Sequence, residues 1–326
     1  MTKTIGVNED ELEEFHNKDK VIFKPKFIEH YSKLTDFEVF KKYSLSFLRR
    51  SIRVNTLKTS VEEMKQALSK NWILTPIPWC KEGFWIESNA EEKRRDVGNL
   101  IEHSLGYIYI QEAASMIPPL VLEPQPDEII LDMCAAPGSK TTQIAQYMEN
   151  KGILIANDFQ FQRLQALGLN IQRCGLRNIV MTLMEGHWFK GFAFDRILVD
   201  APCSGTGTIR KSLKTLLMWN RQGIKQLAGQ QRQLIDVAFN NLKSGGIMVY
   251  STCSNEPEED EAVVSHLLEK YPDAVCEKID LPIKHGPAIM EFEDKKYHEG
   301  VKHCLRLWPQ DNDTEGFFVA KIRKKE

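Results

Sequence analysis

Five apolar segments between residues 128 and 253 constrain the fold of this 326-residue chain more than any other feature. They lie at 128–133, 152–158, 178–184, 195–201 and 246–253. Strands that are apolar on both faces and alternate with helices form a parallel, doubly wound sheet, so we predict an α/β fold here. Ligands of such sheets bind at the carboxyl ends of the strands, which is where functional residues are expected.

The remaining periodic segments predict the helices of this sheet and a smaller unit ahead of it. Helical periodicity occurs at 141–148, 163–174 and 215–242. Before the sheet we predict a helix at 25–45, a strand at 49–57, a helix at 60–71 capped by Ser60, and two short strands in 72–87 about a turn at 81–83. The chain is therefore predicted to have a small α+β domain at 1–106 and a sheet domain at 107–326.

Composition excludes several classes of protein. With 42% hydrophobic and 27% charged residues, the chain is globular rather than disordered. No apolar run is long enough for a membrane helix, and the acidic start is unlike a signal peptide, so we expect a cytoplasmic protein. The seven cysteines form no CxxC pair and the eight histidines are dispersed, so we expect neither a disulfide framework nor a bound metal.

The first strand of the sheet runs into a loop from Asp132 to Lys140, where a doubly wound fold places its ligand. The loop lacks the glycine patterns of dinucleotide-binding and phosphate-binding folds. Pro137 and Gly138 bend the chain, and the next strand ends at Asp158, whose carboxylate could accept two hydrogen bonds from a ribose diol. A nucleoside without a pyrophosphate, such as S-adenosylmethionine, fits better than NAD, and an ordinary βα turn is the alternative.

Two later strands run into Cys203 and Cys253. Most cysteines are small buried hydrophobes, but each of these ends an apolar strand beside turn-forming residues, which places both at the mouth of a site and favours reactivity. Asp200 directly follows an apolar run, and a buried unpaired carboxylate is costly, so it needs a partner or a function. Lys140 is the nearest plausible cation.

In this order, the motifs LDMCAAPGSKT, ND, DAPCSGTG, STCSNEPEEDE and EGFFVAKIRK resemble the Nop/Sun family of RNA cytosine-5 methyltransferases over about residues 107–326. RVNTLK at 53–58 resembles the family's N-terminal region. The resemblance implies a Rossmann-like methyltransferase sheet with an RRM-like N-terminal domain, S-adenosylmethionine as cofactor, and structured RNA as substrate, with tRNA favoured over rRNA. We expect a monomer, and the alternative is a non-catalytic RNA-binding or ribosome-assembly factor that retains the fold.

The resemblance also implies catalytic roles. Carbon 5 of cytosine is too weak a nucleophile for methylation, so Cys253 would first add to carbon 6, and Cys203 would act in releasing the enzyme. DNA cytosine-5 methyltransferases use the Pro-Cys cysteine as nucleophile, so spacing alone leaves the choice open and the family resemblance decides it. Asp200 would hold the base, and Lys140 would stabilise the charge that develops. Cys203, Asp200 or water could remove the carbon 5 proton.

The implied cofactor contacts are the loop backbone for the methionine part, Asp158 for the ribose, and Glu185, where the family usually has aspartate, near the adenine. The full set is Cys134, Ala135, Ala136, Pro137, Gly138, Lys140, Asp158, Arg163, Glu185 and Asp200.

Positive charge gathers in two segments although the net charge is -2. Residues 15–60 hold eleven Lys or Arg against four acids, and the tail carries Lys321, Arg323, Lys324 and Lys325. If both segments flank the cleft of Cys253, they can neutralise RNA phosphates, and we expect this of Arg49, Arg50 and Arg53. The acidic run 256–261 is expected only to start a helix, and Trp188 and Trp219 are expected to be structural.

Overall fold

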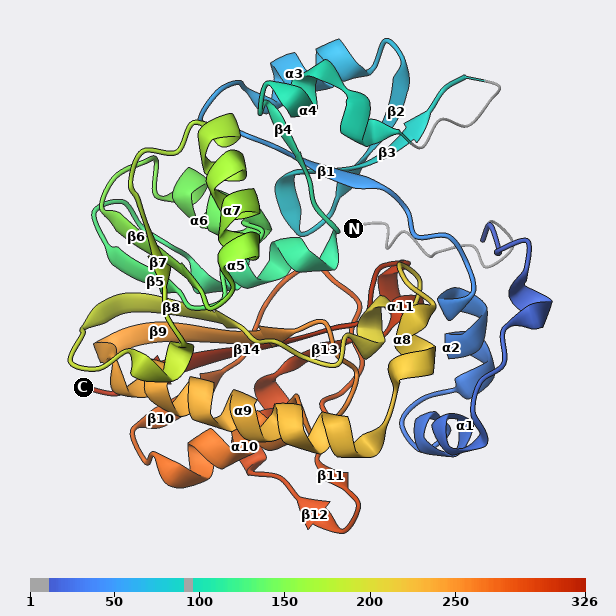
Figure 1. Cartoon of the computed structure of the whole chain (residues 1–326), viewed down its shortest axis with the longest axis vertical. Coiled ribbons are helices and arrows are strands. Elements are labelled where there is room, and N and C mark those ends of the chain that lie inside the picture. Colours follow the sequence, from blue (N-terminus) through green and yellow to red (C-terminus); the bar gives the residue numbers. More distant parts are fainter. Residues whose placement is uncertain (1–11, 91–95) are drawn as a thin grey trace.

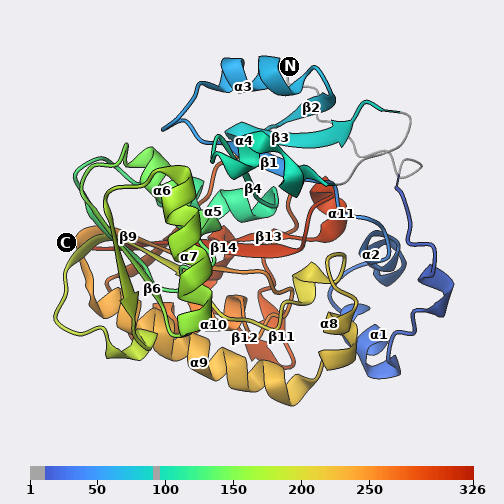
Figure 2. The same cartoon turned by 45° about the horizontal axis from the view of Figure 1, so that its top comes forward.

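The computed structural model describes residues 12–90 and 96–326, and Figures 1 and 2 show a large sheet between two layers of helices, with a smaller sheet beside it. The large sheet has eight strands in the order β10-β14-β9-β8-β5-β6-β7, with β13 paired to β14. Its bounds are β5 Ile129–Asp132, β6 Ile153–Asp158, β7 Ile179–Leu183, β8 Phe194–Asp200, β9 Leu242–Thr252, β10 Ala274–Glu277, β13 Leu305–Leu307 and β14 Phe317–Lys324. The five predicted strands are all present.

The central strands β7, β6, β5, β8 and β9 are parallel, whereas β14 runs antiparallel to β9. The predicted doubly wound α/β sheet is therefore confirmed. Because β5 pairs with β8 and β8 with β9, the carboxyl ends of these three strands lie side by side.

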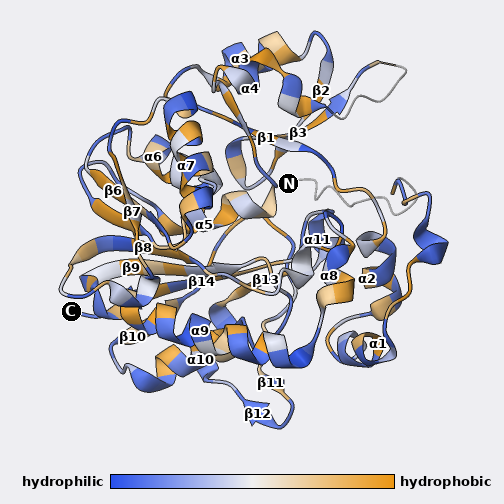
Figure 3. Cartoon of the chain, in the orientation of Figure 1, coloured by the Kyte–Doolittle hydropathy of each residue, from blue (hydrophilic) through white to orange (hydrophobic). Residues whose placement is uncertain are grey.

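Alternate residues of the strands bury on opposite faces of the sheet. Ile130 and Leu198 pack in the cluster formed with α5 and α6, whereas Leu131 and Ile197 pack in the cluster formed with α9 and α10. The helices are α5 Ile117–Leu122, α6 Ser139–Tyr147, α7 Phe161–Cys174, α8 Lys214–Met218, α9 Arg221–Asn240 and α10 Glu261–Lys270. Figure 3 shows the same two-sided pattern, with apolar colour on the strands and polar colour on the outer faces of the helices. Burial on both faces is what keeps the strands apolar throughout.

The predicted long helix at 215–242 is wrong in one respect, because it is two helices. The chain breaks at Trp219 and Asn220, and the Asn220 side chain accepts a hydrogen bond from the Gly223 N–H at 2.7 Å. This cap gives α9 a defined start.

The smaller sheet is antiparallel, in the order β2-β3-β1-β4. Its elements are β1 Ser51–Val54, α3 Val61–Leu68, β2 Trp72–Ile77, β3 Cys80–Ser88, α4 Ile101–Ser104 and β4 Ile108–Ile110. Ser60 caps α3 in a capping box with Glu63, as predicted. The strand pair is also confirmed, but the predicted turn at 81–83 is wrong: these residues lie inside β3, and the chain turns at 78–79 because Trp79 buries its ring against Trp85.

The remaining elements are α1 Pro25–Tyr31, α2 Phe37–Ser44, β11 Glu291–Phe292, β12 Lys295–Lys296 and α11 Pro309–Asn312. The predicted helix at 25–45 is thus two helices, which pack against Trp219 and Trp308 of the sheet domain rather than against the small sheet. The domain boundary between 106 and 107 stays a prediction, and residues 1–11 lie outside the described part of the chain. Within the described ranges, no helix is both long and apolar enough to cross a membrane.

Candidate functional site

Two cysteines meet where β8 and β9 end. The Sγ atoms of Cys203 and Cys253 lie 3.3 Å apart, and both side chains are partly exposed. The register of the two strands, which pairs Asp200 with Ser251, explains why the loops that follow them converge. The prediction that both cysteines end at the same edge of the sheet is confirmed, and their role at a functional site stays a prediction.

Two glycines allow three chain segments to touch behind the thiols. The Gly207 N–H donates to the Cys253 carbonyl at 2.9 Å, and the Gly316 N–H donates to the Gly207 carbonyl at 2.9 Å. A Cβ atom on Gly207 would lie 2.2 Å from the Gly316 oxygen, and one on Gly316 would lie 2.1 Å from Asn255 Oδ1. Only glycine fits at these two positions, so the backbone itself fixes the Cys253 loop.

The acidic run 256–261 has more contacts than the sequence suggested. Helix α10 begins only at Glu261, and Glu256, Glu259 and Asp260 are fully buried ahead of it. Thr252 donates its hydroxyl to Asp260 at 2.5 Å, so the residue before Cys253 is held by this run. The prediction that these acids serve only to start a helix is therefore wrong, because the side chains of Glu259 and Asp260 bond residues next to Cys203 and Cys253.

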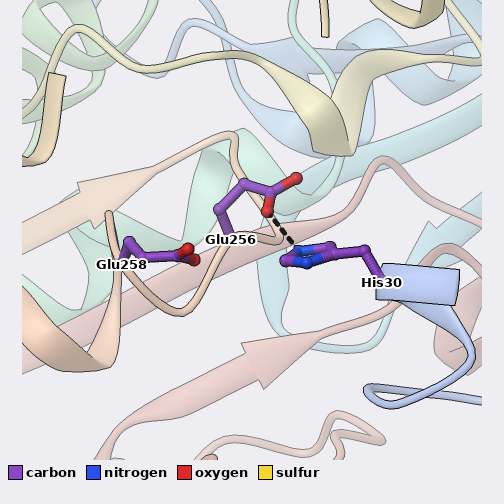
Figure 4. Close-up of side chains that lie close together, drawn as sticks. All are labelled: His30, Glu256 and Glu258. Atoms are coloured by element: carbon purple, nitrogen blue, oxygen red, sulfur yellow. Dashed lines mark hydrogen bonds and ion pairs between the residues drawn. The ribbon is translucent and has the colours of Figure 1, made fainter. Parts of the chain in front are cut away.

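Figure 4 shows one of these acids, Glu256, beside His30 of α1 and Glu258. Each of the three side chains has one nitrogen or oxygen atom of a kind that can bind a metal ion, and these atoms lie within 4.8 Å of one another. The sequence did not suggest this group, because His30 and Glu256 are 226 positions apart. His30 Nε2 lies 2.7 Å from one Glu256 oxygen, and Tyr31 and Trp219 donate to the other at 2.8 and 3.0 Å. Because protein groups contact both oxygens of Glu256, this carboxylate joins α1 to the Cys253 loop. The prediction that Trp219 is structural agrees with its burial.

Asp200 and Lys140 form the ion pair that the sequence suggested. Lys140 Nζ lies 2.7 Å from Asp200 Oδ2, and Ser251 donates its hydroxyl to Asp200 Oδ1 at 2.9 Å. Burial opposes the charge of Lys140, but Asp200 outweighs it and the pKa of Lys140 is raised. Lys140 also interacts electrostatically with Cys253, so a fixed positive charge lies beside the thiol pair.

The two thiols differ in their surroundings. The hydrogen bond to Cys253 and burial raise the pKa of Cys203 well above its usual value, and the charge of Glu259 adds to the shift. Cys203 therefore keeps its proton at neutral pH.

The loop between β5 and α6 forms the other half of the site. Gly138 has φ of +108°, a conformation that favours glycine. Asp158 is buried at the end of β6, where its carboxylate accepts from the Ala136 N–H at 3.3 Å and lies 3.3 Å from Arg163 Nη1. Arg163 also donates to the Ala136 carbonyl. The structure thus brings Asp158 and Arg163 against the Cys134–Gly138 loop.

Asp132, which the sequence marked only as the start of this loop, has an unusual carboxylate. Thr141 donates to its Oδ2 at 2.7 Å, whereas its buried Oδ1 has no hydrogen-bond partner among the described residues. Burial raises the pKa of Asp132 to about 7. An unpaired buried oxygen needs a donor, and the ammonium of an amino-acid ligand supplies one, so this site fits the methionine part of S-adenosylmethionine. An acid directly after an apolar strand, as at Asp200, was the sequence feature that could have identified it.

Glu185 follows β7 and is exposed, with 57% of its side chain accessible and His187 Nδ1 at 3.3 Å from its carboxylate. Asn157 links Met184, the residue before Glu185, to the 132–140 loop. Its side-chain amide donates to the carbonyls of Met133 and Met184 at 3.1 and 2.9 Å. The sequence analysis had not assigned Asn157 a role. Glu185 itself makes no described hydrogen bond to the loop.

The predicted phosphate contact of Arg53 is wrong. Arg53 is 1% exposed and bonds Gln111 and Thr142, each at 2.8 Å, together with Gln146, so it joins the small sheet to α6. Arg49 lies over the Trp85 ring at 4.1 Å, whereas Arg50 is exposed.

The basic tail does not flank the cysteines. In β14, Phe318 pairs with Thr252, the residue before Cys253, but Arg323 pairs with Ile247, which lies five residues further back in β9. Lys321 and Arg323 both contact Glu277. The expectation that the tail neutralises phosphate beside Cys253 is therefore wrong.

Comparison with known families places these features in context. Residues 119–323 match the family model described as 16S rRNA methyltransferase RsmB/F, and residues 23–113 match the model of the N-terminal domain of 16S rRNA methyltransferase RsmF.

The relatives of this chain differ in how much of their own length it covers. The tRNA (cytosine(49)-C(5))-methyltransferase of Pyrococcus abyssi is 48% identical over 97% of this chain and 99% of its own. The ribosomal RNA small subunit methyltransferase F of Aliivibrio fischeri strain MJ11 is 48% identical over 85% of this chain, which spans only 58% of that relative. A solved structure of NSun6 from Pyrococcus horikoshii with SFG, an S-adenosylmethionine analogue, has a TM-score of 0.82 at 26% identity and covers 94% of this chain and 99% of that one.

Proposed function

Because this chain belongs to the RsmB/F, or Nop/Sun, family of S-adenosylmethionine-dependent RNA cytosine-5 methyltransferases, we propose that it methylates carbon 5 of a cytidine in structured RNA through a covalent cysteine adduct. The observation that carries this proposal is the thiol pair at 3.3 Å beside the Lys140–Asp200 ion pair. A thiol nucleophile, a second thiol beside it and a fixed positive charge suit addition to a pyrimidine ring and its reversal.

In the proposed reaction, the thiolate of Cys253 adds to carbon 6 of the cytosine. Asp200 holds the ring, and Lys140 stabilises the negative charge that the addition produces, in positions their ion pair already fixes. The cofactor supplies an electrophilic methyl group, which carbon 5 accepts. Asp200 or water then takes the carbon 5 proton, the carbon 5–carbon 6 double bond forms again, and Cys253 leaves carbon 6 as a thiolate. The raised pKa of Cys203 supports a protonated partner in this release step rather than a second nucleophile.

For the cofactor, we propose that Asp132 pairs with the amino group of S-adenosylmethionine and that the Cys134–Gly138 backbone holds the methionine part. Asp158 would contact the ribose, with Arg163 fixing the loop, and Glu185 would face the adenine region. The unpaired Asp132 oxygen supports the first contact most directly.

We propose tRNA as the substrate. The relative named for cytosine 49 of tRNA matches this chain over nearly the full length of both, whereas the rRNA methyltransferase F relative is much longer than the matched part. Cytosine 49 is therefore the first position to examine.

The test uses purified protein with methyl-labelled S-adenosylmethionine and, separately, unmodified tRNA and 16S rRNA. We expect label at carbon 5 of cytosine in tRNA. Label only in rRNA would overturn the tRNA proposal, and label only on adenine or guanine would overturn the cytosine-5 activity. RNA binding without methyl transfer in a single turnover would favour the alternative of a non-catalytic RNA-binding or ribosome-assembly factor.

A further inference from the structure

We propose that Glu259 is a positioning residue that ties the two cysteine loops to one carboxylate and so holds both thiols in register for addition and release. This inference rests on the proposed function, since it assigns a residue that acts through Cys203 and Cys253. Glu259 is completely buried and belongs to the acidic run ahead of α10.

On the Cys203 side, Glu259 contacts the next residue twice. The Ser204 N–H donates to Glu259 Oε1 at 2.9 Å, and the Ser204 hydroxyl donates to Oε2 at 2.5 Å. Two bonds from one residue to both carboxylate oxygens fix the direction in which the chain leaves Cys203.

On the Cys253 side, the same carboxylate contacts the equivalent residue. The Ser254 hydroxyl donates to Glu259 Oε2 at 2.6 Å, the oxygen that also accepts from Ser204, and the two hydroxyl oxygens lie 3.3 Å apart. One oxygen atom thus joins the residues that follow the two cysteines, and neither loop can shift without breaking a bond to it.

The carboxylate is itself held from outside the loops. Gln231 of α9 donates to Glu259 Oε1 at 3.2 Å and to the Pro202 carbonyl at 2.8 Å, and Tyr250 donates its hydroxyl to the Glu259 carbonyl at 2.6 Å. Glu259 is therefore a fixed point of the sheet domain rather than a mobile side chain. Charged acceptors form stronger hydrogen bonds than neutral ones, which explains a carboxylate at this buried position.

Its charge supports the same assignment. Glu259 helps to raise the pKa of Cys203, after the hydrogen bond to Cys253 and burial. Holding Cys203 close to Cys253 and keeping it protonated are both needed if Cys203 acts only when the adduct is released.

Two variants test the positioning role of Glu259 in different ways. Glu259→Gln removes the charge and one acceptor oxygen, and Ser204→Ala with Ser254→Ala removes both hydroxyl donors but keeps the charge. We expect both to lower single-turnover methyl transfer by roughly 100-fold, because small displacements of reacting groups cost about that much. We also expect a denaturant-resistant RNA adduct to accumulate, because release is impaired, while affinity for S-adenosylmethionine is unchanged. For Glu259→Gln alone, the limb of the pH profile that reports Cys203 should move to lower pH.

Glu258→Gln is the matched control, because Glu258 belongs to the same run but its side chain pairs with Arg221 of α9 at 2.9 Å. It should accumulate no adduct. Variants of Glu259 and of the serine pair that transfer at the parent's rate without adduct would overturn the inference.

A second readout needs no RNA. Dibromobimane bridges neighbouring thiols, and cross-linking of Cys203 to Cys253 should fall several-fold in Glu259→Gln and not in Glu258→Gln. If the parent protein transfers no methyl group but this difference holds, the proposed function fails and the positioning role stands. Equal cross-linking in both variants overturns the positioning role.

Discussion

On the cysteine side of the site, protein groups contact both oxygens of Asp200 and of Glu259, whereas on the cofactor side Asp132 keeps a buried oxygen without a donor. We call these the cysteine half, which contains Cys203, Cys253 and their loops, and the cofactor half, which contains the 132–140 loop. In the first, the carboxylates of Asp200 and Glu259 are fully paired within the protein, and in the second the carboxylate of Asp132 lacks one donor.

The difference follows from what each half has to do. Groups that stabilise charge developing during a reaction act best when they are already fixed, because nothing then has to reorganise as the charge appears. A binding site for a charged ligand can instead leave one group unpaired, since the ligand itself completes it. The hydrogen bonds of the two halves therefore separate proposed chemistry from proposed binding.

The largest expected effect separates the two thiols within the cysteine half. Cys253→Ala should abolish methyl transfer with cofactor affinity intact, because the missing atom contacts only the base. Cys203→Ala should still add and transfer but trap protein on RNA, visible as a slow band on a denaturing gel. The opposite pattern would identify Cys203 as the nucleophile.

The next largest effect is expected from a substitution that breaks the backbone contact behind the thiols. Gly207→Ala places a Cβ 2.2 Å from the Gly316 oxygen and 2.8 Å from the Cys253 oxygen, so the Cys253 loop must move. We expect methyl transfer to fall about 100-fold and stability to fall by about 1–3 kcal/mol, measured by labelled transfer and by urea unfolding. Gly229→Ala in α9, where a Cβ meets nothing within 4 Å, is the control and should leave transfer unchanged.

A moderate effect concerns the cofactor half. Because burial raises the pKa of Asp132 to about 7, the folded protein holds this proton below pH 7 and must lose it to bind a cation. Affinity for S-adenosylmethionine should therefore rise about tenfold between pH 6 and pH 8, as calorimetry would measure, and Asp132→Asn should remove that rise. Without ligand, the same shift makes stability fall as pH increases from 3.8 to about 7. A flat affinity profile in the parent would contradict the pairing.

The smallest effects are expected from substitutions of two arginines, Arg50 and Arg53, which lie outside both halves of the site. Arg50 is exposed at the start of the small sheet, so Arg50→Gln should weaken RNA binding slightly and reduce the salt slope by roughly 0.7 to 0.9. Arg53→Gln should instead lower the melting temperature, because it breaks buried hydrogen bonds to Gln111 and Thr142. Salt-dependent binding and thermal unfolding of the two variants would distinguish these roles, and an unchanged salt slope for Arg50→Gln would move the RNA path elsewhere.

Much of the site could be predicted because it depends on strand order. Parallel strands end at one edge, so Cys203 and Cys253 were expected at the same edge and Lys140 was expected near Asp200, and both pairs are in contact. The sequence does not show where the chain comes back to the site after a long connection between elements. Glu259 reaches both cysteine loops only because the chain folds back before α10, and the short-range pattern of an acidic run suggests a helix start instead.

The burial of charged residues is the second feature that could not be predicted from the sequence. Arg53 lies in a basic stretch typical of a surface, but its partners Gln111 and Gln146 come much later in the chain. The hairpin turn was misplaced for a related reason: residues 81–83 look like a turn locally, and the burial of Trp79 against Trp85 overrides this. In each case a contact distant in sequence or hidden in the core decided the outcome.

The closure of the Cys253 loop by distant segments has a consequence for biosynthesis. Glu256 is held by His30 and Tyr31, which leave the ribosome early, and Gly207 by Gly316, which leaves well after Cys253. A nascent chain therefore carries Cys203 and Cys253 for some time before β14 exists to close the loop around them. In that interval the thiols lack the fixed spacing on which the proposed chemistry depends, so partly made chains should not capture RNA covalently.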